Sequence, residues 1–274
     1  MLEIGINTNC ECGETVEETL ANIQSVGFEN VMVAFKCSNT IDLIEKTQDA
    51  GLNIVYAHLD TSRADDLWTV GESNEHYVNE MCNQIKICGK YHIPIAIMHA
   101  NEGNPSRLVL PPNEHGIKSM LRILEVAKNE NVKIALENVD KPNSDRFTYL
   151  LDNIKSDHFG FCYDVGHHQL YNPELDLLGM YGNRMMAIHL HDNLMDWHYG
   201  YDYTRDLHRL PFDGIIDYVK ICDNLKEIKY SGFVMLEVRK FGMGEPRIYK
   251  DMLAKDYLNE AYIRGIKIKD ILKK

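Results

Sequence analysis

The chain has 274 residues, of which 45% are hydrophobic and 26% are charged, with a formal net charge of −12. This is ordinary globular usage, which gives no support to disordered, fibrous or membrane-spanning classes, and the acidic field disfavours a nucleic-acid partner without excluding it. One closed α/β barrel occupies roughly 200–400 residues. Because no Pro/Ser-rich linker divides the sequence, we expect a single domain over residues 1–274.

Cysteine usage and the amino-terminal segment indicate the compartment. The seven cysteines are an odd number, are scattered and include no CxxC pair, which is typical of reduced thiols. The amino-terminal segment has no basic region followed by a long apolar run, and no stretch approaches the ~18 apolar residues that a membrane span needs. We expect a cytoplasmic protein with no membrane association.

Short apolar runs, bounded by Gly, Asn, Asp or His, alternate along the chain with longer segments of helical periodicity. Eight runs predict strands: Leu2–Asn7, Asn30–Phe35, Leu52–His58, Pro94–His99, Val132–Asn138, Phe159–Asp164, Met185–His191 and Gly232–Val238. Between them, Thr15–Val26, Asn74–Tyr91 and Glu114–Asn129 are predicted amphipathic helices. Nearly continuous apolar character is typical of parallel strands buried on both faces. The fold class we predict is α/β, a (β/α)8 TIM barrel, with an open doubly wound sheet as the alternative.

Polar side chains stand where six of these strands end, at His58, His99, Glu137, Asp164, His189 and Glu237. Burial of an unpaired carboxylate costs several kcal/mol, so a polar residue at the end of a core strand needs a reason. In a barrel the carboxyl-terminal strand ends meet at the face where active sites are built. Shared ligation of cations would remove the cost of burial for all six, and we therefore predict a metal site.

The residue types narrow the choice of ion. Glu137, Asp164, His189 and Glu237 offer three carboxylates and one imidazole, an oxygen-rich set that favours Mn²⁺ or Zn²⁺, with Mg²⁺ and Co²⁺ as alternatives. His191 shares the side of the strand that His189 occupies, so alternation alone does not choose between them.

Five motifs carry a resemblance that runs over nearly the whole chain. They are Leu136-Glu-Asn138, Cys162-Tyr-Asp-Val-Gly-His167, Ile188-His-Leu-His-Asp-Asn193, Asp206-Leu-His-Arg-Leu-Pro211 and Leu236-Glu237. Together they resemble the xylose-isomerase-like TIM barrel superfamily, which holds sugar isomerases and epimerases together with the endonuclease IV branch of apurinic-site nucleases.

In the isomerase and epimerase branches, the resemblance implies one divalent ion at Glu137, Asp164, His189 and Glu237. The two glutamates would be the catalytic acid and base, transferring a proton through an enediolate of a small carbohydrate substrate, a sugar or a sugar phosphate. His167 and His208 would contact substrate hydroxyls. Barrels of this superfamily are often dimers or tetramers, so the resemblance admits a homo-oligomer.

The nuclease branch holds three zinc ions, so the expected number of ions is one to three. A matching residue stands at every one of its nine ligand positions: His58, His99, Glu137, Asp164, His167, His189, Asp206, His208 and Glu237. However, the loop 59–66 has one basic and three acidic residues, a poor surface for DNA. The sugar isomerase or epimerase is therefore the first hypothesis, and an endonuclease IV-like trinuclear zinc phosphodiesterase acting at apurinic/apyrimidinic sites is the alternative. A barrel that only binds a carbohydrate is disfavoured because both glutamates are present.

Three further residues leave two interpretations open. Arg239 has the same inward parity as Glu237, so it either binds a substrate phosphate or carboxylate or forms an ion pair within the protein. Trp68 and Trp197 lie in predicted rim loops, where each either stacks on a sugar ring or packs within its loop.

Overall fold

Eight parallel strands form a nearly closed barrel in the computed structural model, which describes residues 2–35, 39–102, 110–139, 145–194, 205–242 and 247–274. The strands are β1 Ile4–Asn7, β2 Asn30–Ala34, β3 Asn53–His58, β4 Ile95–His99, β5 Lys133–Glu137, β6 Phe159–Asp164, β7 Met185–His189 and β8 Val234–Leu236. They pair in the order β7-β6-β5-β4-β3-β2-β1-β8.

The pairing of Leu190 with Leu236 brings the two ends of this sheet together. The Leu190 amide donates to the Met235 carbonyl over 2.9 Å, and the Glu237 amide donates to the Leu190 carbonyl over 3.2 Å. The barrel prediction is therefore confirmed, and the open doubly wound sheet is excluded.

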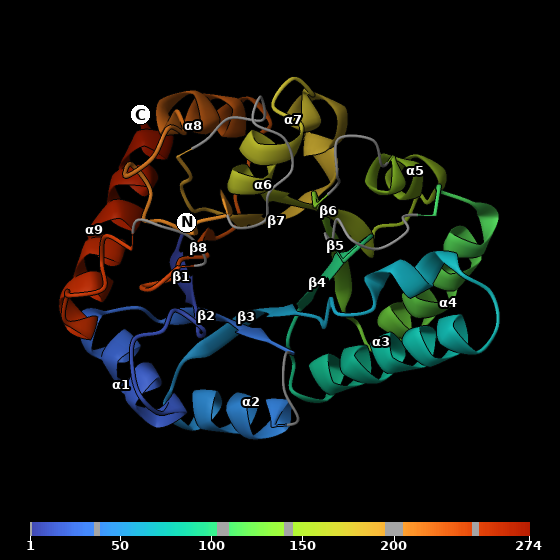
Figure 1. The fold of residues 1–274 in the computed structure, drawn as a ribbon, viewed down its shortest axis with the longest axis horizontal. Coiled ribbons are helices and arrows are strands. Elements are labelled where there is room, and N and C mark those ends of the chain that lie inside the picture. The colour runs from blue at the N-terminus through green and yellow to red at the C-terminus, as the bar shows by residue number, and fades with distance from the viewer. Residues whose placement is uncertain (1, 36–38, 103–109, 140–144, 195–204, 243–246) are drawn as a thin grey trace.

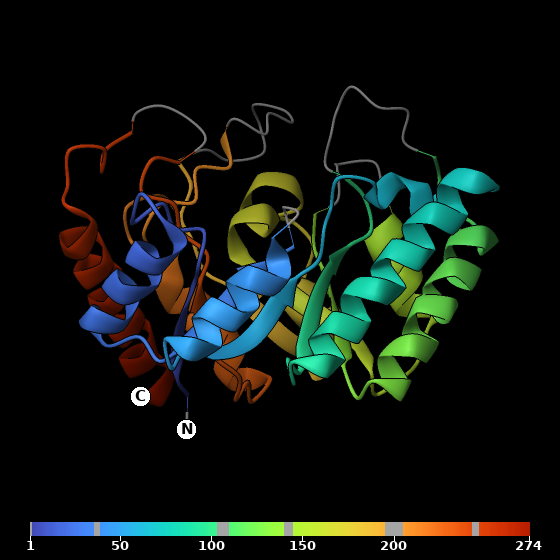
Figure 2. The same cartoon turned by 90° about the horizontal axis from the view of Figure 1, so that it is seen from below.

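Helices surround the barrel on its outer side (Figure 1). They are α1 Val16–Val26, α2 Thr40–Asp49, α3 Glu72–Lys90, α4 Glu114–Asn129, α5 Arg146–Asn153, α6 Val165–Tyr171, α7 Leu177–Tyr181, α8 Tyr218–Glu227 and α9 Ala254–Lys273, with short 3-10 helices η1 Ala64–Trp68 and η2 Gly182–Arg184. Figure 2 shows that both termini lie at one end of the barrel.

Local sequence signals explain where the helices begin and which face they bury. The Thr15 hydroxyl accepts a hydrogen bond from the Glu18 amide, so it caps α1 at its amino end. Asn113 caps α4 by accepting from the amides of residues 115 and 116. Along α4 the predicted apolar stripe is buried, with Met120 and Ile123 fully covered.

Apolar side chains fill the barrel interior below its mouth, which is the end where the carboxyl termini of the strands meet. This cluster contains Met32, Val55, Tyr56, Ile97, Ala135, Cys162, Ala187 and Met235, all of them buried. Packing of this kind makes the interior a core and not a pore. Polar chemistry is consequently confined to the rim above it.

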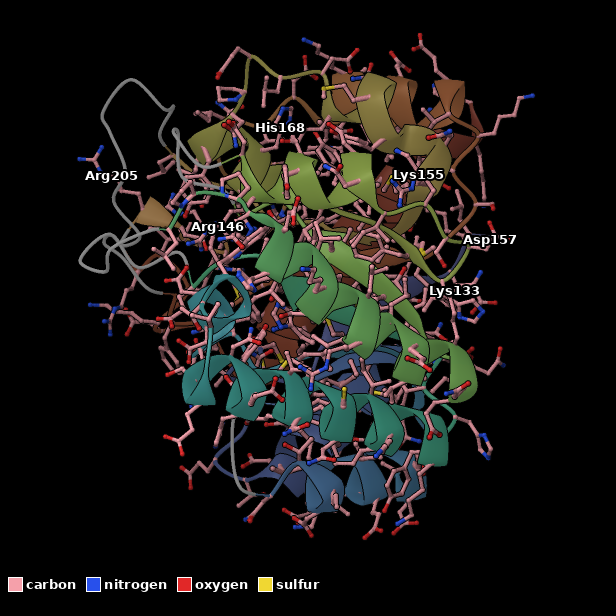
Figure 3. The ribbon with its side chains drawn as sticks, turned by 90° about the vertical axis from the view of Figure 1, so that its right-hand side faces the viewer. Lys133, Arg146, Lys155, Asp157, His168 and Arg205 are labelled. Atoms are coloured by element: carbon pink, nitrogen blue, oxygen red, sulfur yellow. The ribbon has the colours of Figure 1, made fainter. Side chains whose placement is uncertain are left out.

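A buried arginine ties together three of the loops at the mouth. Arg146 is 0% exposed, forms an ion pair with Asp65, and donates from Nε to the Leu110 carbonyl over 2.8 Å. Its guanidinium also lies 5.3 Å from the centre of the Trp68 ring. Figure 3 shows Arg146 toward the end of the molecule that carries Arg205, with Lys133 and Asp157 at the opposite end.

Replacing Gly116 with alanine tests the packing of Trp68 against α4. An alanine Cβ would lie 2.3 Å from the Trp68 ring, so the ring or the helix must shift, and overpacking of this kind costs about 1–3 kcal/mol. We expect Gly116→Ala to lower the free energy of unfolding in urea by that amount. Lys118→Ala, at an exposed position of the same helix, is the control and should change it by less than about 0.5 kcal/mol. Equal losses in both variants would contradict this packing.

Candidate metal centre

The nine predicted ligand residues converge at the carboxyl-terminal end of the barrel. Six are supplied by the ends of β3 to β8, where the strand register places Glu137 beside His99 and Asp164 beside His189. The other three come from segments that follow strands: His167 from α6, and Asp206 and His208 from the loop after β7. All nine fall into three groups whose candidate ligand atoms lie within 4.8 Å of one another.

The central group is Glu137, Asp164, His189 and Glu237. Nδ1 of His189 lies 3.4 Å from a Glu137 oxygen, 3.5 Å from an Asp164 oxygen and 2.9 Å from a Glu237 oxygen. Three carboxylates thus surround one imidazole nitrogen in a buried place. A divalent cation among them would satisfy all four groups.

The second group joins His58 and His99 to Glu137. Nε2 of each histidine lies 3.2 Å from the same Glu137 oxygen. On the other side of the His58 ring, Nδ1 lies 3.0 Å from the Leu59 carbonyl oxygen. A carbonyl only accepts, so Nδ1–H donates to it and Nε2 of a neutral imidazole keeps its lone pair toward Glu137, as in many metal-binding histidines.

The third group contains His167, His191, Asp206 and His208. One Asp206 oxygen lies 3.2 Å from Nε2 of His167 and 2.9 Å from Nε2 of His208. His208 donates from Nδ1 to the Glu237 carbonyl over 2.8 Å, so its Nε2 also faces a carboxylate. The backbone of His208 has φ of 47°, an uncommon conformation for a residue with a side chain.

His191 is the residue that the predicted ligand set lacked. Its Nε2 lies 3.0 Å from Asp164, and its ring stacks on that of His208 with centroids 4.1 Å apart. Because side chains alternate along β7, the sequence placed His189 and His191 on the same side of the strand and did not decide which of them belongs to the predicted metal site. In the structure both reach the mouth, His189 in the central group and His191 in the third.

Two neighbouring side chains fix the ligands in place. Asn138 donates to the Asp164 carbonyl and accepts from the Asp164 amide, which locks the end of β6 to the end of β5. Asp192 accepts from the amides of Asn193, Phe212 and Ile216. Because Asp192 holds both ends of the segment that carries Asp206 and His208, it positions ligands without touching them.

The electrostatics of the cluster follow from burial and from mutual attraction. Burial would raise the pKa of Glu137 and of Glu237, but the adjacent histidines, above all His189, hold both pKa values well below their ordinary range. Burial would likewise lower the pKa of His189, yet the surrounding acidic groups raise it well above its usual value. In the absence of a metal cation, the histidines of this cluster would have to be protonated in order to balance the negative charge of the carboxylates.

Several buried polar atoms of the cluster face another ligand atom without forming a well-aligned hydrogen bond. Nδ1 of His167 lies 2.9 Å from Oε1 of Glu137, and Nδ1 of His189 lies 2.9 Å from a Glu237 oxygen. Nδ1 of His99 and Nε2 of His189 have no hydrogen-bond partner among the described residues. Native proteins leave few buried polar groups unsatisfied, and unpaired groups of this kind often mark an ion. The donor chemistry of the cluster therefore fits one or more divalent cations.

Other candidate residues take structural positions. Burial raises the pKa of the Cys162 thiol to about 12, which fits a small protonated core residue. Trp68 is 1% exposed and donates to the Ala100 carbonyl, so it packs within its loop and does not face a sugar. Trp197 lies outside the described residues. Arg239 lines a cavity at the mouth.

Comparison with known proteins agrees with this geometry. The model of the family described as xylose isomerase-like TIM barrel matches residues 42–261. A D-allulose 3-epimerase from Methylomonas sp. has a TM-score of 0.76 at 15% identity, with 99% of this chain and 98% of that chain covered. A xylose isomerase domain protein from Alicyclobacillus acidocaldarius has a TM-score of 0.74 at 14% identity, with 100% of both chains covered. At these identities the likeness concerns the fold.

Two curated relatives match parts of the chain. An uncharacterized protein of Sinorhizobium fredii is 36% identical over 105 residues, which are 36% of this chain and 31% of that protein. An uncharacterized protein of Methanocaldococcus jannaschii is 28% identical over 135 residues, which are 45% of this chain and 43% of that protein. The matches thus span less than half the length of these relatives. No helix in the described parts of the chain is long and apolar enough to cross a membrane. On the family match, the chain belongs to the xylose isomerase-like TIM barrels.

Proposed function

We propose that the protein is a divalent-metal-dependent sugar or sugar phosphate isomerase or epimerase that acts by proton transfer at substrate carbon through an enediolate. The observation that carries the proposal is the central group, in which Glu137, Asp164 and Glu237 surround His189 at the barrel mouth. Sugar 3-epimerases of similar fold support it, among them an L-ribulose 3-epimerase with a TM-score of 0.72. Mn²⁺ or Zn²⁺ suits the donor set best.

Each residue of the central group has a role that follows from its place. When bound, a divalent ion supplies polarisation of a substrate carbonyl and its adjacent hydroxyl. Glu137 and Glu237 are carried by strands separated by β6 and β7, so their carboxylates approach a bound sugar from different sides. One can take a proton from carbon while the other returns it. Asp164 and His189, together with the two glutamates, would hold the ion, and His167 and His208 would orient substrate hydroxyls.

The two glutamates differ in exposure, which affects how each of them meets the substrate. The side chain of Glu237 is 13% exposed and that of Glu137 is 1% exposed. Glu237 therefore faces the space through which a substrate enters, whereas Glu137 lies below it among four histidines, His58, His99, His167 and His189. The histidines hold the pKa of both carboxylates well below the ordinary value, so each can accept a proton, and the carboxylate that returns a proton to carbon must first take it from water.

The second and third groups favour one alternative function. Together with the central group they reproduce the residue set of a trinuclear phosphodiesterase acting at apurinic/apyrimidinic sites. Neighbouring ions in such a cluster favour attack on a phosphoester. Against it stands the net charge of −12, which on average repels a DNA backbone. The sugar reaction remains the better supported proposal.

Exchange of the two glutamates for glutamine tests their catalytic role. An amide retains weak metal affinity but cannot accept a proton, so Glu137→Gln and Glu237→Gln should each reduce solvent-deuterium incorporation into a ketose by at least about 10³-fold. NMR of the sugar after incubation in D₂O measures this. Asp152→Asn, on the outer helix α5, is the control and should exchange normally. Full exchange in both glutamine variants would refute the assignment.

Removal of the metal should destabilise the fold. A ligand that binds only the folded state contributes about 2.7 kcal/mol at a hundredfold excess over its Kd, so chelation should lower Tm by roughly 5–10 °C in a chain of this size. Addition of Mn²⁺ or Zn²⁺ should restore it, as followed by calorimetry. An Asp164→Asn/His189→Gln double variant should show no such response. An unchanged Tm in the wild type after verified metal removal would oppose metal dependence.

His208 separates the two metal chemistries. We expect His208→Ala to weaken sugar turnover more than it reduces total metal, since the central group does not include His208. Elemental analysis per chain and a ketose assay provide the two readouts. If the wild type instead cleaves an abasic-site duplex, and the variant loses that cleavage together with a third ion, the phosphodiesterase would be the correct function.

A further inference from the structure

Four basic residues surround a narrow pocket at the carboxyl end of β8, beside the metal centre. They are Arg209, Arg239, Lys240 and Arg247. Such a gathering is unexpected in a chain with a net charge of −12. Like charges repel when they are brought together, so a cationic pocket at a candidate active site needs a physical reason.

The backbone after β8 determines which way Arg239 faces. Val238 is 0% exposed, packs in the layer between the barrel and the helices, and donates to Asn7. Because side chains alternate along an extended segment, Glu237 and Arg239 both point to the opposite side, toward the mouth. The Arg239 amide donates to the His208 carbonyl over 3.0 Å. Arg239 is therefore anchored by its backbone next to the centre.

The Arg239 side chain has no acidic partner among the described residues. No carboxylate of those residues lies within ion-pair distance of its guanidinium, whereas Arg122, Arg146 and Arg264 each have an acidic partner. In the described parts of the chain, the guanidinium of Arg239 therefore borders a cavity without a carboxylate paired to it.

Arg239 also borders a larger cavity of about 460 Å³ over the ends of β1 and β2. Its walls include the polar residues Thr8 and Asn9. Glu11 and Glu14 line it too, and the Glu11 carboxylate accepts a hydrogen bond from the Phe241 amide. Arg239, two residues after Glu237, is thus the basic residue in the wall of this cavity.

We infer that Arg239 binds an anionic group, a phosphate or a carboxylate, at the far end of the sugar whose reacting carbons lie between Glu137 and Glu237. The inference rests on the proposed function and specifies its substrate class as sugar phosphates or sugar acids. The planar guanidinium matches two oxygens of either group in a bidentate pair. Two residues of extended chain separate Arg239 from Glu237 by ~7 Å, which leaves room for the carbons between the reacting centre and the anion.

Binding of inorganic phosphate and of gluconate to the full-length, metal-loaded protein tests this by isothermal titration calorimetry. Arg239→Gln should weaken binding of at least one of the two anions tenfold or more. Arg239→Lys should have an affinity between those of the wild type and Arg239→Gln, because lysine keeps the positive charge but cannot donate two parallel hydrogen bonds to the anion. Arg122→Gln, which removes one positive charge from the outer helices, should bind as the wild type does. The anion that shows the dependence identifies the phosphate or the acid. Equal affinity in wild type and Arg239→Gln for both anions would overturn the inference, because the anion would then sit on the metal.

Turnover separates this inference from the proposed function. For ribulose and ribulose 5-phosphate, or for a ketose and its acid, the ratio of kcat/KM for the charged over the neutral sugar should fall at least tenfold in Arg239→Gln and not in Arg122→Gln. An unchanged ratio would overturn the inference while leaving the isomerase proposal intact. If neither sugar exchanges deuterium but phosphate binding still depends on Arg239, the anion site stands and the isomerase proposal fails.

Discussion

Four carboxylates lie at one end of the barrel with histidine nitrogens directed at them, those of Glu137 and Asp164 buried and those of Asp206 and Glu237 partly buried. Transfer of a charged carboxylate from water into a protein is costly unless opposite charge accompanies it. Protons on the histidines or divalent ions between the ligands are the available sources of that charge. The rest of the mouth is arranged around this requirement, and it explains why buried ring nitrogens and carboxylate oxygens there face one another without well-aligned hydrogen bonds.

Parallel strand pairing is what makes the cluster possible. All eight strands end at the same rim, and the register sets Glu137 beside His99 and Asp164 beside His189. Each of the strands β3 to β8 supplies a candidate ligand from a backbone whose hydrogen bonds are already satisfied, so the ligand atoms would need little further ordering when an ion binds. The apolar interior below the rim keeps water out from beneath.

Buried charged residues hold the loops at the mouth of the barrel in place. Arg146 ties the segments after β3 and β4 to the start of α5, and Asp192 gathers the amides of the segment after β7. These buried charges hold irregular backbone in place by hydrogen bonds that span many residues of sequence. Arg239 contrasts with Arg146, since it has no acidic partner among the described residues, and a side chain without a partner at a cavity is suited to binding a ligand.

The sequence by itself determined the strands, the barrel and the residues at the strand ends, because hydrophobic alternation and the cost of burying polar groups act locally. His58, His99, Glu137, Asp164 and Glu237 could be picked out in this way. Only the tertiary structure decided that His189 joins the central group and His191 the third, since the two share one side of the strand. It also decided that Trp68 is buried and that Arg239 has no ion-pair partner in the described chain, because both depend on side chains that lie far away in the sequence and are brought close only when the barrel closes.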